Sequence, residues 1–101
     1  MEKKVIGIDP GLTGGIAVFD GIDLLKHWAM PIKPNTVKTS KTKTILNSDK
    51  IKELLEETLP RIVVIEKAFS PIGQAGSSYM ENYGIILGIC IGLGIPYKEI
   101  S

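Results

Sequence analysis

Two acidic residues, Asp9 and Glu66, each follow a short run of apolar residues. The runs at residues 5–8 and 62–65 are rich in β-branched side chains, which predicts buried strands. A carboxylate at the end of a buried strand is costly unless it is paired or binds a cation. Neighbouring parallel strands stand about 4.8 Å apart, so both carboxylates could reach one ion. Since hard divalent cations prefer oxygen ligands, the two acids predict a site for such a cation.

Each acid also has a simpler interpretation. Asp9 precedes Pro10-Gly11 and could merely shape a turn, as aspartate often does. Glu66 could pair with Lys67, but neighbouring residues of a strand point to opposite faces. Because the two acids share the same setting, the metal-ligand interpretation is favoured.

The composition limits the class of protein. The chain has 101 residues, 44% of them hydrophobic and 23% charged, which predicts a single domain over residues 1–101 with its own core. The single cysteine, Cys90, excludes a disulfide within the chain and a Cys/His zinc cluster. The N-terminus has no signal-peptide pattern, and the apolar stretch at 85–96 is shorter than the roughly 18 to 20 residues of a membrane span. We therefore expect a soluble, cytoplasmic protein without a membrane partner.

The first half of the chain predicts an antiparallel meander. Strands are expected at residues 4–9, 16–20 and 22–30, with a type I′ turn at Asp20-Gly21. The segment from Pro31 to Thr44 is rich in lysine, threonine and serine and is predicted to be a mobile loop.

The second half alternates helix and strand. Asn47 or Ser48 is expected to cap a helix over residues 49–58, which Pro60 ends. Its apolar face is predicted to consist of four residues: Ile51, Leu54, Leu55 and Leu59. A strand at 61–66, parallel to the first, precedes a helix that begins with the capping box Ser78–Glu81 and runs to Leu93. A fifth strand is expected at 95–100. The order βββαβαβ predicts an α/β fold, a mixed five-stranded sheet flanked by helices.

Three pieces of sequence resemble a known family. They are Gly7-Ile8-Asp9-Pro10-Gly11, Val64-Ile65-Glu66-Lys67 followed by Phe69, and a third piece made of residues 73–78, 83–88 and 93–97. In this order and at this spacing, they resemble the RuvC-type Holliday junction resolvases (crossover junction endodeoxyribonucleases) of the ribonuclease H-like superfamily. The resemblance spans nearly the whole chain.

The resemblance implies a function and a set of site residues. Family members are homodimers that resolve four-way DNA junctions in recombination and repair by Mg²⁺-dependent phosphodiester hydrolysis, with Mn²⁺ as an alternative ion. Asp9 and Glu66 would be the first two catalytic carboxylates of a site that holds two ions. Phe69 matches the family's aromatic residue that enters the junction. Gln74 and Ser77 would contact DNA phosphates.

Further DNA contacts are expected from basic residues. Lys38, Lys41 and Lys43 alternate with threonine and serine, which also donate to phosphates, although a solvated surface explains the same pattern. Lys67, beside Glu66, is a second candidate for a phosphate contact. The lone His27 and Cys90 are expected to be structural.

Three glycines of the second helix, Gly84, Gly88 and Gly92, share one helix face. Each weakens the helix by up to about 1 kcal/mol relative to alanine, which indicates close approach of another backbone. That backbone belongs either to the sheet of the same subunit or to a partner helix, and the resemblance favours a homodimer interface.

One departure from the family sets the alternatives. The family takes its remaining catalytic acids from a helix after the fifth strand, whereas this sequence stops at Ser101, so the fold is expected to be truncated there. An engineered fragment, a truncated gene product or a domain completed by another polypeptide would each explain this. The first alternative function is a non-catalytic fragment that binds DNA junctions.

A second alternative is the N-terminal part of a sugar kinase or ATPase of the ASKHA type. Those proteins also begin with a strand, an Asp-x-Gly-x-Thr loop and a hairpin, and residues 9–13 fit loosely. They need a much longer chain with a second domain. Tight ATP binding would favour this alternative, whereas junction binding without cutting would favour the first one.

Overall fold

The meander at the start of the chain forms because apolar, β-branched residues fill its first two strands, where every second side chain is buried. The computed structural model describes residues 4–37, 44–67 and 77–101. Strands β1 (Lys4–Asp9), β2 (Gly15–Asp20) and β3 (Asp23–Ala29) pair antiparallel in sequence order. One face of β1 and β2 is buried through Ile6, Ile8, Ile16 and Val18.

The turn between β2 and β3 differs from the prediction. Asp20 pairs with Asp23, so the two-residue loop is Gly21-Ile22. Gly21 has a φ of 61°, and Ile22 is not among the described residues with positive φ. A type I′ turn needs positive φ at both positions, so that prediction is wrong, and the pattern fits a type II′ turn. An irregularity in the β2–β3 register between Val18 and Phe19 accompanies the shifted turn.

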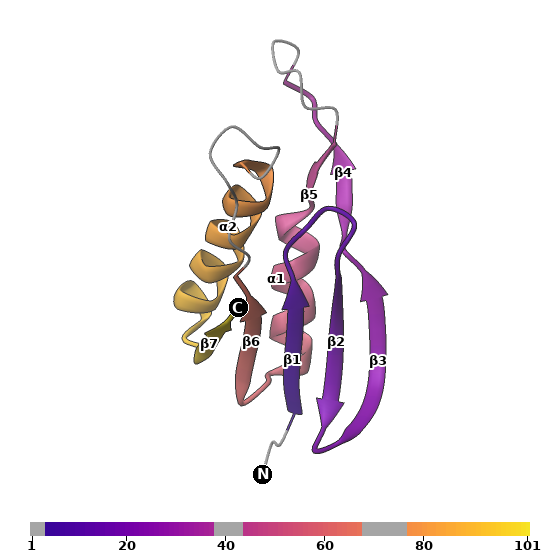
Figure 1. Cartoon of the computed structure of the whole chain (residues 1–101), viewed down its shortest axis with the longest axis vertical. Helices are drawn as coiled ribbons and strands as arrows, with labels where there is room; N and C mark the ends of the chain where they lie inside the picture. The colour runs from indigo at the N-terminus through magenta and orange to yellow at the C-terminus, as the bar shows by residue number, and fades with distance from the viewer. Residues whose placement is uncertain (1–3, 38–43, 68–76) are drawn as a thin grey trace.

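A second, small sheet replaces part of the predicted loop. Strands β4 (Ile32–Pro34) and β5 (Thr44–Leu46) form an antiparallel pair, which extends beyond the main sheet (Figure 1). The prediction of a loop from Pro31 to Thr44 is therefore wrong for Ile32–Pro34 and for Thr44. Lys33 and Pro34 obscured the strand pattern of β4.

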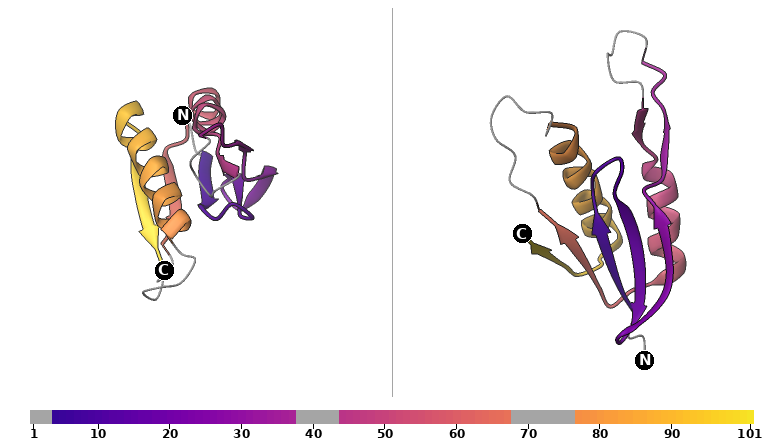
Figure 2. Two further views of the ribbon diagram at one scale, coloured as in Figure 1. Left: turned by 90° about the horizontal axis from the view of Figure 1, so that it is seen from above. Right: turned by 45° about the vertical axis from the view of Figure 1, so that its right-hand side comes forward.

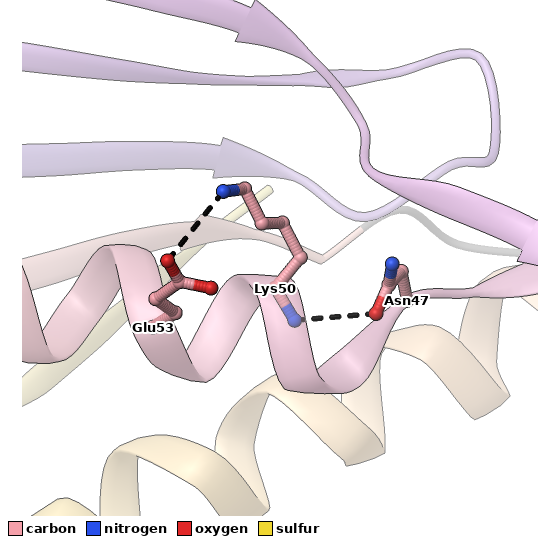
Figure 3. Close-up of polar contacts among 3 residues, drawn as sticks. All are labelled: Asn47, Lys50 and Glu53. Atoms are coloured by element: carbon pink, nitrogen blue, oxygen red, sulfur yellow. Dashed lines mark hydrogen bonds and ion pairs between the residues drawn. The ribbon is translucent and has the colours of Figure 1, made fainter.

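Helix α1 (Ser48–Thr58) begins at a side-chain cap. Asn47 Oδ1 accepts a hydrogen bond from Lys50 N at 3.2 Å, and Lys50 Nζ lies 3.7 Å from Glu53 Oε1 (Figure 3). This confirms Asn47 as the capping residue. Ile51, Leu54 and Leu55 are buried as predicted. Leu59 is 64% exposed in a left-handed conformation after the helix, so its predicted place on the apolar face is wrong.

Two parallel strands complete the main sheet. β6 (Ile62–Glu66) pairs with β1, and β7 (Tyr97–Ile100) pairs with β6, which gives the order β3-β2-β1-β6-β7. Between them lies α2 (Ser77–Leu93), which is followed by Gly94. The predicted mixed five-stranded sheet is confirmed.

Both helices pack against the same face of the sheet. The buried residues of both helices pack with Val63 and Ile65 of β6 in one core. Helix α2 contributes Tyr83, Ile86 and Cys90 to this core. On the other face, Val5, Gly7, Ala17 and Val64 retain partial exposure. Figure 2 shows the helices and strands from two further directions.

The three glycines of α2 lie on its outer side. A Cβ added at Gly84, Gly88 or Gly92 would meet no atom within 4 Å. The alternative in which these glycines allow close packing on the sheet is therefore wrong. Met80 and Ile91 on the same helix are 39% and 64% exposed, so α2 presents an apolar outer surface.

Within the described part of the chain, no helix is long and apolar enough to cross a membrane.

Candidate metal centre

Asp9 is the last residue of β1, and its carboxylate is exposed at that end of the sheet. Its Oδ1 accepts a hydrogen bond from Gly11 N at 3.2 Å, which orients the group. The turn folds back tightly, because a Cβ at Gly14 would lie 2.8 Å from Asp9 Cγ. A glycine at this position is thus required for the turn to close around the carboxylate.

Glu66 is the last residue of β6 and lies beside Asp9. The parallel register pairs Gly7 with Val64 and Ile8 with Ile65. Continuing it by one residue places Asp9 level with Glu66, on the face away from the helices. Adjacent strands are about 4.8 Å apart, so the two carboxylates are within joint reach of a cation.

A groove on this open face contains both acids. Its volume is about 430 Å³. The lining includes Gly7, Asp9, Ala17, His27, Val64 and Glu66. His27 shares the face because it pairs with Ala17, which pairs with Gly7. Two exposed carboxylates in an open groove fit a Mg²⁺ ion, which keeps several of its water ligands.

The described residues supply no third ligand of the usual kinds. No group of three His, Cys, Asp or Glu side chains comes together in residues 4–37, 44–67 and 77–101. Glu99 is the nearest acid along the sheet, since it pairs with Ile65 in the β6–β7 register. That register directs its side chain to the helix face, opposite to Glu66.

Lys67 also points to the helix face. Its Nζ lies 3.7 Å from Glu99 Oε2 and 5.8 Å from the centre of the Tyr83 ring. Burial, and then the nearby Glu99 carboxylate, raises the pKa of Tyr83 to about 12, although the hydroxyl makes no hydrogen bond of normal geometry with a described residue. Lys67 thus already pairs with an acid on the face opposite to the groove.

The other predicted DNA-contact residues are not described. Lys38, Lys41, Lys43, Phe69 and Gln74 lie outside the described residues. Ser77 begins α2, and only its backbone is described. These assignments stay predictions.

Sequence reasoning missed three residues at the site. His27 was expected to be structural, and only the register of β2 with β3 brings it to the groove. Tyr79 Oη donates to Glu66 O at 2.8 Å, and Asn82 Nδ2 donates to Pro10 O at 3.0 Å. Tyr79 and Asn82 lie three residues apart on the predicted helix, which indicates that they share a helix face. This spacing does not identify the residues that they contact.

The sheet order, the crossover helices and the strand-end acids define a ribonuclease H-like α/β fold. Among solved structures, the chain is similar to RuvC from Thermus thermophilus in complex with a Holliday junction substrate, with a TM-score of 0.71 and 22% identity over 98% of this chain. A second structure of RuvC from the same organism gives a TM-score of 0.65 and 23% identity over 96%. The RuvC-like fold predicted from the sequence is thus confirmed.

The match covers only part of those proteins. The chain spans 64% and 63% of the two RuvC chains. No protein-family model and no curated protein sequence matches the chain.

Proposed function

We propose that residues 1–101 act as one domain of a Mg²⁺-dependent endonuclease that hydrolyses phosphodiester bonds in four-way DNA junctions. The observation that carries this proposal is the pair of carboxylates, Asp9 and Glu66, at adjacent strand ends within a RuvC-like fold. One of the similar structures holds a Holliday junction substrate, which supports branched DNA as the partner.

The two acids have distinct surroundings. The Gly11 N–H fixes one oxygen of Asp9 and leaves the second oxygen for a cation. Glu66 is exposed at the rim of the same groove. Asp9 and Glu66 would hold Mg²⁺ there, as a pair of ions in the complete site, or Mn²⁺ in its place, and the metal would supply Lewis-acid activation of water and positive charge against the leaving oxygen.

The proposed DNA surface surrounds this end of the sheet. The β4–β5 pair extends beyond it (Figure 1), and the segment that joins these two strands carries Lys38, Lys41 and Lys43. We assign phosphate contacts to these lysines and to Lys67, Gln74 and Ser77, and entry into the junction to Phe69. A homodimer through Gly84, Gly88 and Gly92 suits a substrate with two strands to be cut. A cytoplasmic location fits this role.

The first test is cleavage of a synthetic four-way junction with Mg²⁺ or Mn²⁺. Linear duplex of the same sequence is the substrate control, and Glu66→Gln is the matched variant because it removes charge with little change in size. Paired nicks in the junction alone, lost in Glu66→Gln, are the expected result. Cutting that persists in Glu66→Gln would contradict the assignment of this residue.

A non-catalytic junction-binding protein is the second candidate function. It is favoured by the finding that only two acids meet in the described part of the chain. Junction affinity measured by gel shift without divalent cations distinguishes it. Binding that weakens steeply with salt, without any cleavage, would favour this candidate over the nuclease.

A further inference from the structure

The ladder between β1 and β6 reaches to within one residue of Asp9 and Glu66 but does not include them. In the described sheet, the β1–β6 pairing runs from Val5–Ile62 to Ile8–Ile65 and stops one residue before the acids. Each acid is paired on its outer side instead, Asp9 with Gly15 and Glu66 with Ile100. A further contact with both strand ends would therefore help to fix the separation of the two acids.

The first two turns of α2 make such a contact with both strand ends. The Tyr79 hydroxyl donates to the backbone carbonyl of Glu66 at 2.8 Å. The buried Asn82 amide donates to the carbonyl of Pro10, the residue after Asp9, at 3.0 Å. Asn82 is only 5% exposed, so this second bond is shielded from water.

The two donors belong to one rigid unit. Residues three apart in a helix lie on the same face, so Tyr79 and Asn82 keep a fixed spacing. The Tyr79 ring also lies near the β1–β2 turn, since a Cβ added at Gly11 would lie 3.7 Å from Tyr79 Cδ2. Gly11 is the residue whose N–H orients Asp9. Tyr79 thus bonds to the strand end that carries Glu66 and lies near the turn that orients Asp9.

We propose that Tyr79 and Asn82 are positioning residues that set the separation of the Asp9 and Glu66 carboxylates. The inference rests on the proposed function, because it assumes that the two acids bind one divalent cation together. Neither residue would be a ligand of the cation, since both donate to backbone carbonyls. Both act through backbone carbonyls that adjoin the ligands, as partners that orient metal ligands commonly do.

The test is a direct measurement of Mn²⁺ binding. The electron paramagnetic resonance signal of the free ion reports how much Mn²⁺ is bound, and Mg²⁺ serves as the competitor. Tyr79→Phe removes one hydroxyl and retains the ring against Gly11. Tyr97→Phe makes the same chemical change on β7 and is the matched control. Asn82→Ala is the second variant, and urea unfolding without metal reports the stability of each protein.

We expect Tyr79→Phe to weaken Mn²⁺ binding about tenfold, the lower end of the usual effect of losing such a partner. Tyr97→Phe should bind as the unmodified chain does. Unchanged Mn²⁺ affinity in Tyr79→Phe, with or without lower stability, would overturn the positioning role and leave the proposed function intact. If Mn²⁺ binding in the unmodified chain does not depend on Glu66, tested with Glu66→Gln, the shared cation site itself is wrong.

Discussion

Gly14 controls the space around Asp9. In Gly14→Ala, the added methyl group would lie 2.8 Å from Asp9 Cγ and would also collide with the Asp9 carbonyl. We expect this variant to lose Mn²⁺ affinity and to be less stable by about 1–3 kcal/mol, the usual cost of overpacking. Urea unfolding and Mn²⁺ titration measure the two effects.

The control for the loss of stability in Gly14→Ala is Gly7→Ala on the same β-meander. Its added methyl group would meet no atom within 4 Å. Equal losses in the two variants would show that any methyl group is harmful here, and that the tight turn around Asp9 is not the cause.

Cys90 is a buried reporter of unfolding. Its side chain is 0% exposed, and burial raises the pKa of its thiol, so both access and thiolate formation are suppressed. We expect a thiol reagent such as dithionitrobenzoate to react only at the rate of unfolding, and rapidly in urea. Labelling of the folded protein as fast as that of the denatured protein would place Cys90 outside the core.

At the residue scale, the sequence predicted that Asp9 and Glu66 end two neighbouring strands, but not which side chains surround them. Asp9 and Glu66 follow apolar runs, a local pattern that needs no knowledge of packing. The place of His27 depends on the register between β2 and β3, which includes an irregularity at Val18–Phe19. The Asn82–Pro10 contact joins residues 72 positions apart, so no local pattern encodes it.

At the scale of elements, the cap of α1 is a measurable source of stability. Asn47→Ala removes the side-chain acceptor of the Lys50 N–H and should cost about 1 kcal/mol. The shift of the urea midpoint tests this. Glu53→Gln is the comparison, since it breaks only an exposed ion pair that contributes about 0.5 kcal/mol or less. A loss in Asn47→Ala no larger than in Glu53→Gln would argue against the cap.

Strongly patterned elements could be predicted from the sequence, whereas irregular ones could not. β1, α1 and β6 have clear periodicity or capping residues, and their observed bounds agree with prediction to within one residue. The β4 strand has three residues, two of them lysine and proline, which left no strand signal. The Gly21-Ile22 turn was misplaced by one residue because the prediction rested on the Asp20-Gly21 dipeptide alone, whereas the observed turn follows from the pairing of Asp20 with Asp23.

At the scale of the whole molecule, the outer surface of α2 predicts association. Gly88→Arg adds a long charged side chain where the single chain leaves open space, so its fold should tolerate the change. We expect sedimentation velocity to show a dimer for the unmodified chain and a monomer for Gly88→Arg. Ile22→Arg is the control, because it makes the same change of charge at a turn residue that is 97% exposed.

Either of two results would contradict the predicted interface. One is a dimer that persists in Gly88→Arg, and the other is a dimer that Ile22→Arg disrupts to the same extent. The second result would indicate a general effect of added positive charge.

The pairing of β1 with β6 across α1 has a consequence for folding. Residues 4–29 form a meander of local contacts, which is the part of the chain that can assemble rapidly. That intermediate structure would carry Asp9 alone. Glu66 arrives only after the chain has closed the long loop through α1 and β6 has docked in parallel. A nascent or partly unfolded chain would therefore hold half of the proposed cation site, and competence to bind the ion would appear only with the later, non-local docking of β6.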